Sequence, residues 1–451
     1  MANLYLSFLG TNDYLPCTYE HQNRKIENVR FVQEATIRLH CMDWSQNDRV
    51  IIFTTPQALN LNWKDDGQIN RSSGERIQQF GLETCIKNIK GNFSWNRVDI
   101  PDGRNEKEIW NIFLKVFDIV EEEDKIIFDI THAFRSIPLL AIVILNYARI
   151  MKNISLSGIY YGALEALGGI NEVKKMQPEK RIVPIIDLTA FDQLMEWSVA
   201  ADRFIKSGDA SWVSKIAEHT ASTILSETKG NDRSQHTIRN LARNLDKFTK
   251  TLATCRGRDI SPVVERLKQT LENCQNLTFN NPLNMPLKAI IGKIDSQINM
   301  FSNHQIRDGI KAARWCLEHN LVQQSYTILQ ETLITYFIYK IGEDTENYGN
   351  KNLLRTLAGQ AIAIIMPYIL NNTGKKLPFK EWKSDAQNNK ELIEKFISFY
   401  KTQPRLVKTY NDLTGYRNDL NHAGHSADPR PAGTFIKKMP GFLDDVESTI
   451  T

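Results

Sequence analysis

Apolar and polar positions change their spacing along the chain, and this change divides the chain into two parts. Before about residue 190, short continuous apolar runs alternate with longer stretches in which apolar residues recur every three or four positions. The short runs predict buried strands and the longer stretches predict helices. The predicted strands are 4–9, 50–54, 125–130, 156–161 and 181–187. The predicted helices between them are 29–43, 73–90, 106–121 and 135–151. This alternation predicts an α/β, Rossmann-like domain, in which helices cover both faces of a mostly parallel sheet.

The strand pattern stops after Asp187, and helical spacing continues almost to the end of the chain. Val322, Tyr326 and Leu329, for example, lie on one stripe of a helix. We therefore expect an all-α C-terminal part. The expected division is an N-terminal domain over 1–190, a helical linker or insert over 191–300 and a terminal helical domain over 301–451.

Composition excludes little, because 41% hydrophobic and 24% charged residues are ordinary values for a globular protein. The formal net charge of +4 does not by itself identify a nucleic-acid-binding protein. The six cysteines lack zinc-ligand spacing and are typical of reduced thiols in a cytoplasmic protein. The N-terminus has no basic leader, and the longest apolar run, 137–145, is too short to span a bilayer. We expect no membrane partner.

Three polar loops follow predicted strands, where open α/β sheets bind ligands. The first contains Gly10, Thr11, Asn12 and Tyr14, the second contains Thr131, His132, Phe134, Arg135 and Ser136, and the third contains Gly162 and Glu165. The second loop opens a helix, whose free N–H groups favour phosphate. Each loop alone is explained equally well by a helix cap or a turn. No GxGxxG sequence or P-loop is present, which argues against a dinucleotide or a nucleoside triphosphate bound in the usual way.

The sequence GYRNDLNH, residues 415–422, carries the candidate chemistry of the C-terminal part. A spacing of four places Asn418 and His422 on one helix face, where an amide can orient an imidazole. Arg417 points roughly 140° away from His422 in an ideal helix, so one helix alone makes a poor site. Histidine suits proton transfer and arginine suits phosphate charge, as phosphodiester cleavage requires. The alternative is that Arg417 and Asp419 are solvated and that His422 only ends the helix.

The sequence DITHAFRS, residues 129–136, resembles the D-x-T-H-G-F-R-S motif of CRISPR-associated CARF domains, with Ala133 in the place of the usual glycine. CARF domains bind a cyclic oligoadenylate on a dimer axis. The resemblance implies that the eleven loop residues named above bind such a ligand, with cyclic tetra-adenylate favoured. It gives no cofactor beyond this allosteric activator.

Arg417 and His422 also match the R-x4-H form of the motif of HEPN-domain ribonucleases, and the stretch 325–337 resembles the helix that precedes it. The order of CARF and then HEPN is similar to that of Csx/Csm-type ribonucleases of type III CRISPR systems. The resemblance implies a homodimer, or a higher oligomer, that cleaves single-stranded RNA when the CRISPR complex supplies the activator. Arg417 and His422 are then catalytic and Asn418 supports them, whereas His425 lies outside the motif.

Other interpretations stay open at this point. His132 or Thr131 can take part in cleaving the ligand itself, and a nucleotide-responsive transcription regulator requires a recognition helix that the sequence does not clearly show. Residues 229–268 hold ten Lys or Arg against four Asp or Glu, which fits an RNA-facing surface, although a solvated helical face is the commoner explanation. We find no cluster of metal ligands near Arg417 and expect metal-independent cleavage that uses the RNA 2′-hydroxyl.

Overall fold

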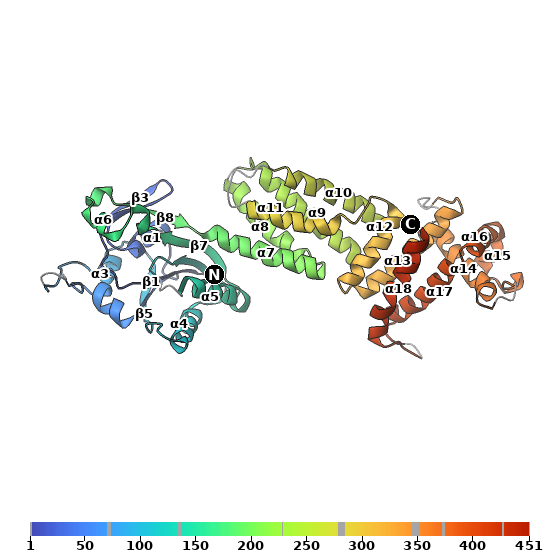
Figure 1. Cartoon of the computed structure of the whole chain (residues 1–451), viewed down its shortest axis with the longest axis horizontal. Coiled ribbons are helices and arrows are strands. Elements are labelled where there is room, and N and C mark those ends of the chain that lie inside the picture. Colours follow the sequence, from blue (N-terminus) through green and yellow to red (C-terminus); the bar gives the residue numbers. More distant parts are fainter. Residues whose placement is uncertain are drawn as a thin grey trace. The chain divides into compact units, whose positions relative to one another are not determined.

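The computed structural model describes residues 2–69, 74–132, 137–227, 229–277, 285–344, 351–371, 375–425 and 428–450 (Figure 1). Its contacts divide the chain into two units, Met1–Gln193 and Leu194–Thr451. In the described part of the chain, all named strands belong to the first unit, and the second unit is helical.

One eight-stranded sheet forms the centre of the first unit. Its strands are β1 (Asn3–Leu9), β2 (Cys17–His21), β3 (Arg24–Val29), β4 (Arg49–Thr54), β5 (Ser94–Asp99), β6 (Lys125–Asp129), β7 (Ser155–Gly162) and β8 (Ile182–Asp187). Their order across the sheet is β3-β2-β8-β7-β6-β1-β4-β5. The run from β7 to β5 is parallel throughout, whereas β8 is antiparallel to β7 and β3 is antiparallel to β2. The prediction of a mostly parallel sheet is confirmed.

Helices cover both faces of this sheet, as predicted. They are α1 (Val32–His40), α2 (Pro56–Ala58), α3 (Leu82–Lys87), α4 (Glu106–Ile119), α5 (Ile137–Lys152) and α6 (Ile170–Lys175), with the shorter turns η1 (Leu59–Trp63), η2 (Leu164–Leu167) and η3 (Pro178–Lys180). Alternate residues of β1 point to opposite faces. Leu4, Leu6 and Phe8 share a buried cluster with α4 and α5, whereas Tyr5 and Leu9 share another with α1 and α3.

The sequence pattern failed for the outer strands and for one helix. The hairpin of β2 and β3 and the edge strand β5 were not predicted, because their residues are mixed in polarity and half-exposed or exposed at many positions. The helix expected over 73–90 is reduced to α3. Within the described residues ahead of it, Arg76 pairs with Ile69 in an isolated bridge and the Asp65 carboxylate accepts from the Gly81 N–H at 2.6 Å.

The second unit contains helices from end to end. They are α7 (Thr189–Ser207, which begins before the unit boundary), α8 (Ser211–Glu227), α9 (Arg233–Ala253), α10 (Ile260–Gln275), α11 (Met285–Ile298), α12 (Gln305–Glu318), α13 (Val322–Lys340), α14 (Lys351–Asn371), α15 (Ser384–Asn388), α16 (Lys390–Thr402), α17 (Pro404–Asn421) and α18 (Ala432–Ile450), with the turns η4 (Gly257–Asp259) and η6 (Phe379–Glu381). One buried apolar cluster extends from Ala200 to Val446. Residues of the stretch 191–300 share this cluster with the rest of the unit. That this stretch is a linker or an insert stays a prediction.

One helix among the described residues, Asn352–Leu370 within α14, is long and apolar enough to cross a membrane by length and composition alone. Helix α14 contacts α13, α16 and α17, and Leu357, Ala361 and Ile365 are completely buried. A core helix of this kind passes the same test as a membrane span.

Candidate functional site

Three neighbouring strands of the parallel run, β7, β6 and β1, end at one edge of the sheet and bring the predicted loops together. Gly10 follows β1, Thr131 and His132 follow β6, and Gly162 is the last residue of β7. The Thr131 hydroxyl accepts a hydrogen bond from the Gly162 N–H at 2.8 Å. The rings of His132 and Tyr14 lie 4.3 Å apart between centroids. The structure thus assembles five of the residues predicted to bind the ligand.

A buried carboxylate fixes the second loop. Asp129 has no exposed surface, and its Oδ1 accepts from the Thr131 hydroxyl at 2.6 Å and from the Thr131 N–H at 3.0 Å. Its Oδ2 accepts from Ser7 at 3.0 Å and from the Tyr5 hydroxyl at 3.2 Å. Burial raises the pKa of Asp129, although each of these hydrogen bonds favours the charged carboxylate. Thr131 is therefore held by hydrogen bonds on both sides of its hydroxyl.

Two buried polar atoms at this edge lack a hydrogen-bond partner of ordinary geometry among the described residues. They are the Tyr14 hydroxyl and His132 Nε2. Burial lowers the pKa of His132 to about 3 and raises the pKa of the Tyr14 phenol, so both side chains are neutral near pH 7. Leaving such groups unsatisfied costs about 1–3 kcal/mol each, and a ligand that hydrogen-bonds to them recovers part of this cost.

Two glycines keep this edge open to close approach. A Cβ at Gly10 would lie 2.4 Å from the Tyr14 hydroxyl, and a Cβ at Gly162 would lie 2.7 Å from Val32 Cγ2. Both distances are too short for a side chain to be added without movement of the neighbours. Glycine at the ends of β1 and β7 is thus favoured by packing.

The first loop is held by a residue that the sequence analysis missed. The Asn62 side chain, completely buried on the π-helical turn η1, donates to the carbonyls of Gly10 and Asn12, at 2.9 Å each. Its Oδ1 accepts from Arg30 at 3.0 Å and from Gln68 at 2.8 Å. No motif points to Asn62, because it is 52 residues from Gly10 in the sequence and reaches the loop only through the fold.

The other residues predicted to bind the ligand have different surroundings. Thr11 and Asn12 belong to the first loop, and Asn12 is exposed. Glu165 is exposed on η2 and accepts a hydrogen bond from the Tyr161 hydroxyl, which contributes to raising the pKa of that phenol to about 12. Three predicted residues lie outside the described residues: Phe134, Arg135 and Ser136.

In the second unit, α17 carries the three predicted catalytic residues at its C-terminal end. Arg417 donates to the Asn418 side chain at 3.4 Å, a long hydrogen bond, and Arg417 Nε is buried without a partner among the described residues. The helix ends at Asn421, and His422 is its C-cap, with an exposed imidazole. The structure thus brings Arg417 and Asn418 together, whereas the His422 imidazole makes no hydrogen bond to either of them within the described residues.

Asp419 departs from the alternative in which it is a solvated helix residue. It is buried, and its Oδ2 accepts from the Arg430 N–H at 3.0 Å and from the Arg430 guanidinium at 3.2 Å. That guanidinium also lies over the Tyr416 ring, 4.4 Å from its centroid. Asp419 therefore fixes the segment that precedes α18 beside the candidate catalytic helix.

The side chains near Arg417 come from α13 and from the turn after α9. Burial raises the pKa of the Cys255 thiol, with smaller opposing effects from a hydrogen bond to Thr327 and from the charges of Arg256 and Arg417. Glu331 on α13 forms an ion pair with Arg355 and raises the pKa of the same thiol. Arg417 thus lies in a polar environment that already contains other cations.

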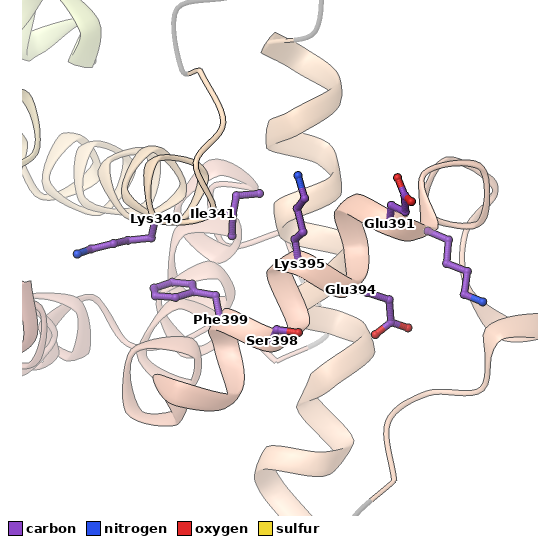
Figure 2. Close-up of a pocket in the computed structure, with 8 residues that line it drawn as sticks. Lys340, Ile341, Glu391, Glu394, Lys395, Ser398 and Phe399 are labelled. Carbon is purple, nitrogen blue, oxygen red and sulfur yellow. The ribbon is translucent and has the colours of Figure 1, made fainter.

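A hollow in the second unit lies elsewhere, between the end of α13 and α16 (Figure 2). Its volume is about 760 Å³, and Figure 2 shows Lys340 and Ile341 facing Lys395 and Phe399. None of the residues predicted for ligand binding or catalysis lines this hollow. Within the described residues, no group of three His, Cys, Asp or Glu side chains has an arrangement that would hold a metal ion.

Comparison with known proteins identifies the first unit. Residues 4–165 match the family described as the CARF domain of CRISPR system endoribonuclease Csx1. A segment of 123 residues is 33% identical to CRISPR-associated protein MJ1674 of Methanocaldococcus jannaschii. This segment covers 27% of the chain and only 18% of that relative. The resemblance of the first unit to CARF domains is confirmed, and the chain is homologous to a CRISPR-associated protein.

Proposed function

We propose that the chain is an endoribonuclease of type III CRISPR antiviral defence, activated by a cyclic oligoadenylate and acting in the cytoplasm. The match of residues 4–165 to a CARF domain is the observation that carries this proposal. The buried, unpartnered atoms of Tyr14 and His132 support a ligand with hydrogen-bonding groups at the edge where β1, β6 and β7 end. Cyclic tetra-adenylate is the ligand that we favour.

The proposed cleavage needs only groups of the RNA and of α17. The ribose 2′-oxygen attacks the adjacent phosphorus, and the bond from phosphorus to the 5′-oxygen breaks, which leaves a 2′,3′-cyclic phosphate and a 5′-hydroxyl. His422 moves a proton between these oxygens, and Asn418 orients the His422 imidazole. Arg417 binds the charge that develops on the phosphate. No metal ion takes part in this scheme.

We propose that the active form is a homodimer or a higher oligomer. An exposed apolar stripe on α5 of the sensor unit supports a partner surface, since a contiguous stripe of this kind is unusual on a monomer. Its members recur every three or four residues: Leu139, Ile142, Val143, Tyr147 and Ile150. Their exposed fractions run from 43% to 77%, so α5 leaves this face uncovered within its own chain. A second copy of α5 is its proposed partner.

The test is a cleavage assay of single-stranded RNA with and without cyclic tetra- and hexa-adenylate, on the full chain. We expect cleavage to rise with one ring size and to disappear in His422→Ala, while calorimetry shows unchanged ligand binding. A protein that binds the ligand but leaves RNA intact would refute the ribonuclease assignment and would keep the sensor assignment.

A further inference from the structure

A stripe of basic side chains runs along the outer face of α9. The face has six exposed positions spaced three or four residues apart: Arg233, His236, Asn240, Arg243, Lys247 and Lys250. Four of them are cations: Arg233, Arg243, Lys247 and Lys250. The opposite face of α9 is buried and apolar, with Ile238, Leu241, Leu245 and Phe248 in the core of the unit. The orientation of the helix is thus fixed by packing against α8 and α10, and the basic positions lie on its exposed face.

The carboxylates beside this stripe neutralise it only in part. Lys250 pairs with Asp246 at 2.6 Å and Arg243 pairs with Glu218 of α8 at 3.0 Å. Both cations are more than half exposed, and ion pairs of this kind contribute about 0–1 kcal/mol. The structure gives no ion pair for Lys247 within its described residues. A polyanion that binds the stripe therefore has to displace only weak ion pairs within the protein.

The C-terminal end of the stripe leads to the candidate catalytic helix. Beyond Lys250, the Ala253 carbonyl accepts from the side chain of Gln324, at the start of α13, at 3.3 Å. The neighbouring residue Gln323 donates to Asn421, the last residue of α17, at 3.1 Å. The first turn of α13 thus contacts both the end of α9 and the end of the helix that carries Arg417.

We propose that the outer face of α9 binds the backbone of the single-stranded RNA substrate and guides it toward Arg417 and His422. This inference rests on the proposed ribonuclease function. The stripe from Arg233 to Lys250 is about 26 Å long at 1.5 Å per residue, which suits a strand of phosphates followed along one line. Because the contacts are to phosphates, binding is independent of sequence and depends strongly on salt.

The hollow between α13 and α16 provides a matched control, because its lysines alternate with carboxylates. Glu391 and Glu394 lie on the same wall of the hollow as Lys390 and Lys395 (Figure 2). It borders the end of α13 near Lys340, about 25 Å along that helix from Gln323 and Gln324, which contact α17 and α9. Lysines here have the same charge as the α9 stripe and lack its continuity with the catalytic helix.

The experiment compares two full-length variants on a His422→Ala background, so that the RNA stays intact. The test variant is Arg233→Gln, Arg243→Gln, Lys247→Gln and Lys250→Gln. The control is Lys340→Gln and Lys390→Gln, which line the hollow, together with Lys380→Gln and Lys383→Gln at exposed positions of the segment that precedes α16. Each variant removes four positive charges from exposed helical or turn positions. Fluorescence anisotropy with a labelled single-stranded RNA oligonucleotide measures Kd between 50 and 200 mM salt. Circular dichroism verifies that both variants remain folded.

The salt slope is the steepness with which the logarithm of RNA affinity falls with the logarithm of salt concentration. If all four α9 cations contact phosphates, removing them lowers this slope by about 2.8. Between 50 and 200 mM salt, the parent then loses about 50-fold more affinity than the test variant. The control variant keeps the parent slope. An unchanged slope in the test variant, or an equal loss in both variants, overturns the assignment. If the α9 face binds an acidic protein and not RNA, the salt slope of the test variant stays unchanged.

The same experiment separates this inference from the proposed function. If the His422→Ala parent binds RNA but the protein with His422 never cleaves it, the ribonuclease function is refuted. The salt slopes of the test and control variants then still decide whether α9 binds RNA. A parent that does not bind RNA at all refutes both.

Discussion

Replacing Asn62 by alanine should loosen the first ligand loop and weaken binding of the activator. The side chain makes four hydrogen bonds, two to the carbonyls of Gly10 and Asn12 and two from Arg30 and Gln68. Asn12 is exposed, so water can replace the bonds to the loop, which we count at about 0.5 kcal/mol each. The bond to charged Arg30 and the bond to buried Gln68 contribute about 1.5 and 1 kcal/mol. The expected local destabilisation is about 3–4 kcal/mol.

Hydrogen exchange of the backbone amides around residues 10–14 measures this local stability without requiring that the two units unfold together. A loss of about 3–4 kcal/mol corresponds to exchange faster by a factor of about 100 to 1,000. Titration calorimetry with cyclic tetra-adenylate should show weaker binding, because the ligand must now order the loop on binding.

Asn60→Ala is the matched control, since Asn60 lies on the same π-helical turn and its exposed side chain makes no hydrogen bond within the described residues. It should leave exchange and affinity unchanged. If Asn62→Ala accelerates exchange less than about tenfold, the hydrogen bonds seen in the structure do not hold the loop. If exchange accelerates but affinity is unchanged, the loop does not contribute to the ligand site.

Four further predictions follow from the two sites. Arg417→Ala and His422→Ala should each abolish RNA cleavage in gel assays while leaving dimerisation and activator affinity intact. Changing Thr131 and Arg135 to Ala should weaken activator binding in calorimetry and raise the activator concentration needed, with basal cleavage unchanged; equal affinity would place the ligand elsewhere. Cleavage should persist in EDTA and stop at a single 2′-deoxy sugar, whereas rescue of an EDTA-inhibited enzyme by magnesium would exclude the proposed chemistry. The pKa of His132 is about 3 in the folded chain and about 6.5 in an unfolded chain, so the unfolded chain binds a proton more readily. The free energy of unfolding should therefore fall by up to about 1.4 kcal/mol per pH unit as the pH is lowered from 6 to 4. Urea titrations should show a smaller fall in His132→Gln.

The central strands were predictable because they are buried on both faces. Leu4–Leu9 and Arg49–Thr54 are almost entirely buried, so their apolar runs are continuous in the sequence. The edge strand Arg24–Val29 is exposed at most positions, and its sequence does not differ from that of a loop. The sequence therefore predicted the centre of the sheet and the position of the loops that follow its strands, and missed its borders.

Side chains that act across the fold were the second kind of failure. Asn62 and Asp419 are ordinary polar residues in the sequence, and both become buried hydrogen-bonding centres only because distant segments pack against them. The C-terminal limit of α17 also mattered, because ending the helix at Asn421 makes His422 a cap and not a residue within the helix. Helical spacing alone gave the order of these residues and not their mutual geometry.

The two incomplete features of this chain have one common explanation. Arg417 hydrogen-bonds to Asn418, while the His422 imidazole makes no hydrogen bond to either within the described residues, so one α17 does not gather both groups around a phosphate. The apolar stripe of α5, from Leu139 to Ile150, is uncovered within its own chain. In a twofold dimer, each surface meets its own copy, so pairing through α5 covers the stripe, and the same symmetry supplies a second α17. A ligand that binds one arrangement of the two sensor units more tightly would then favour the arrangement in which the two α17 helices form a competent site.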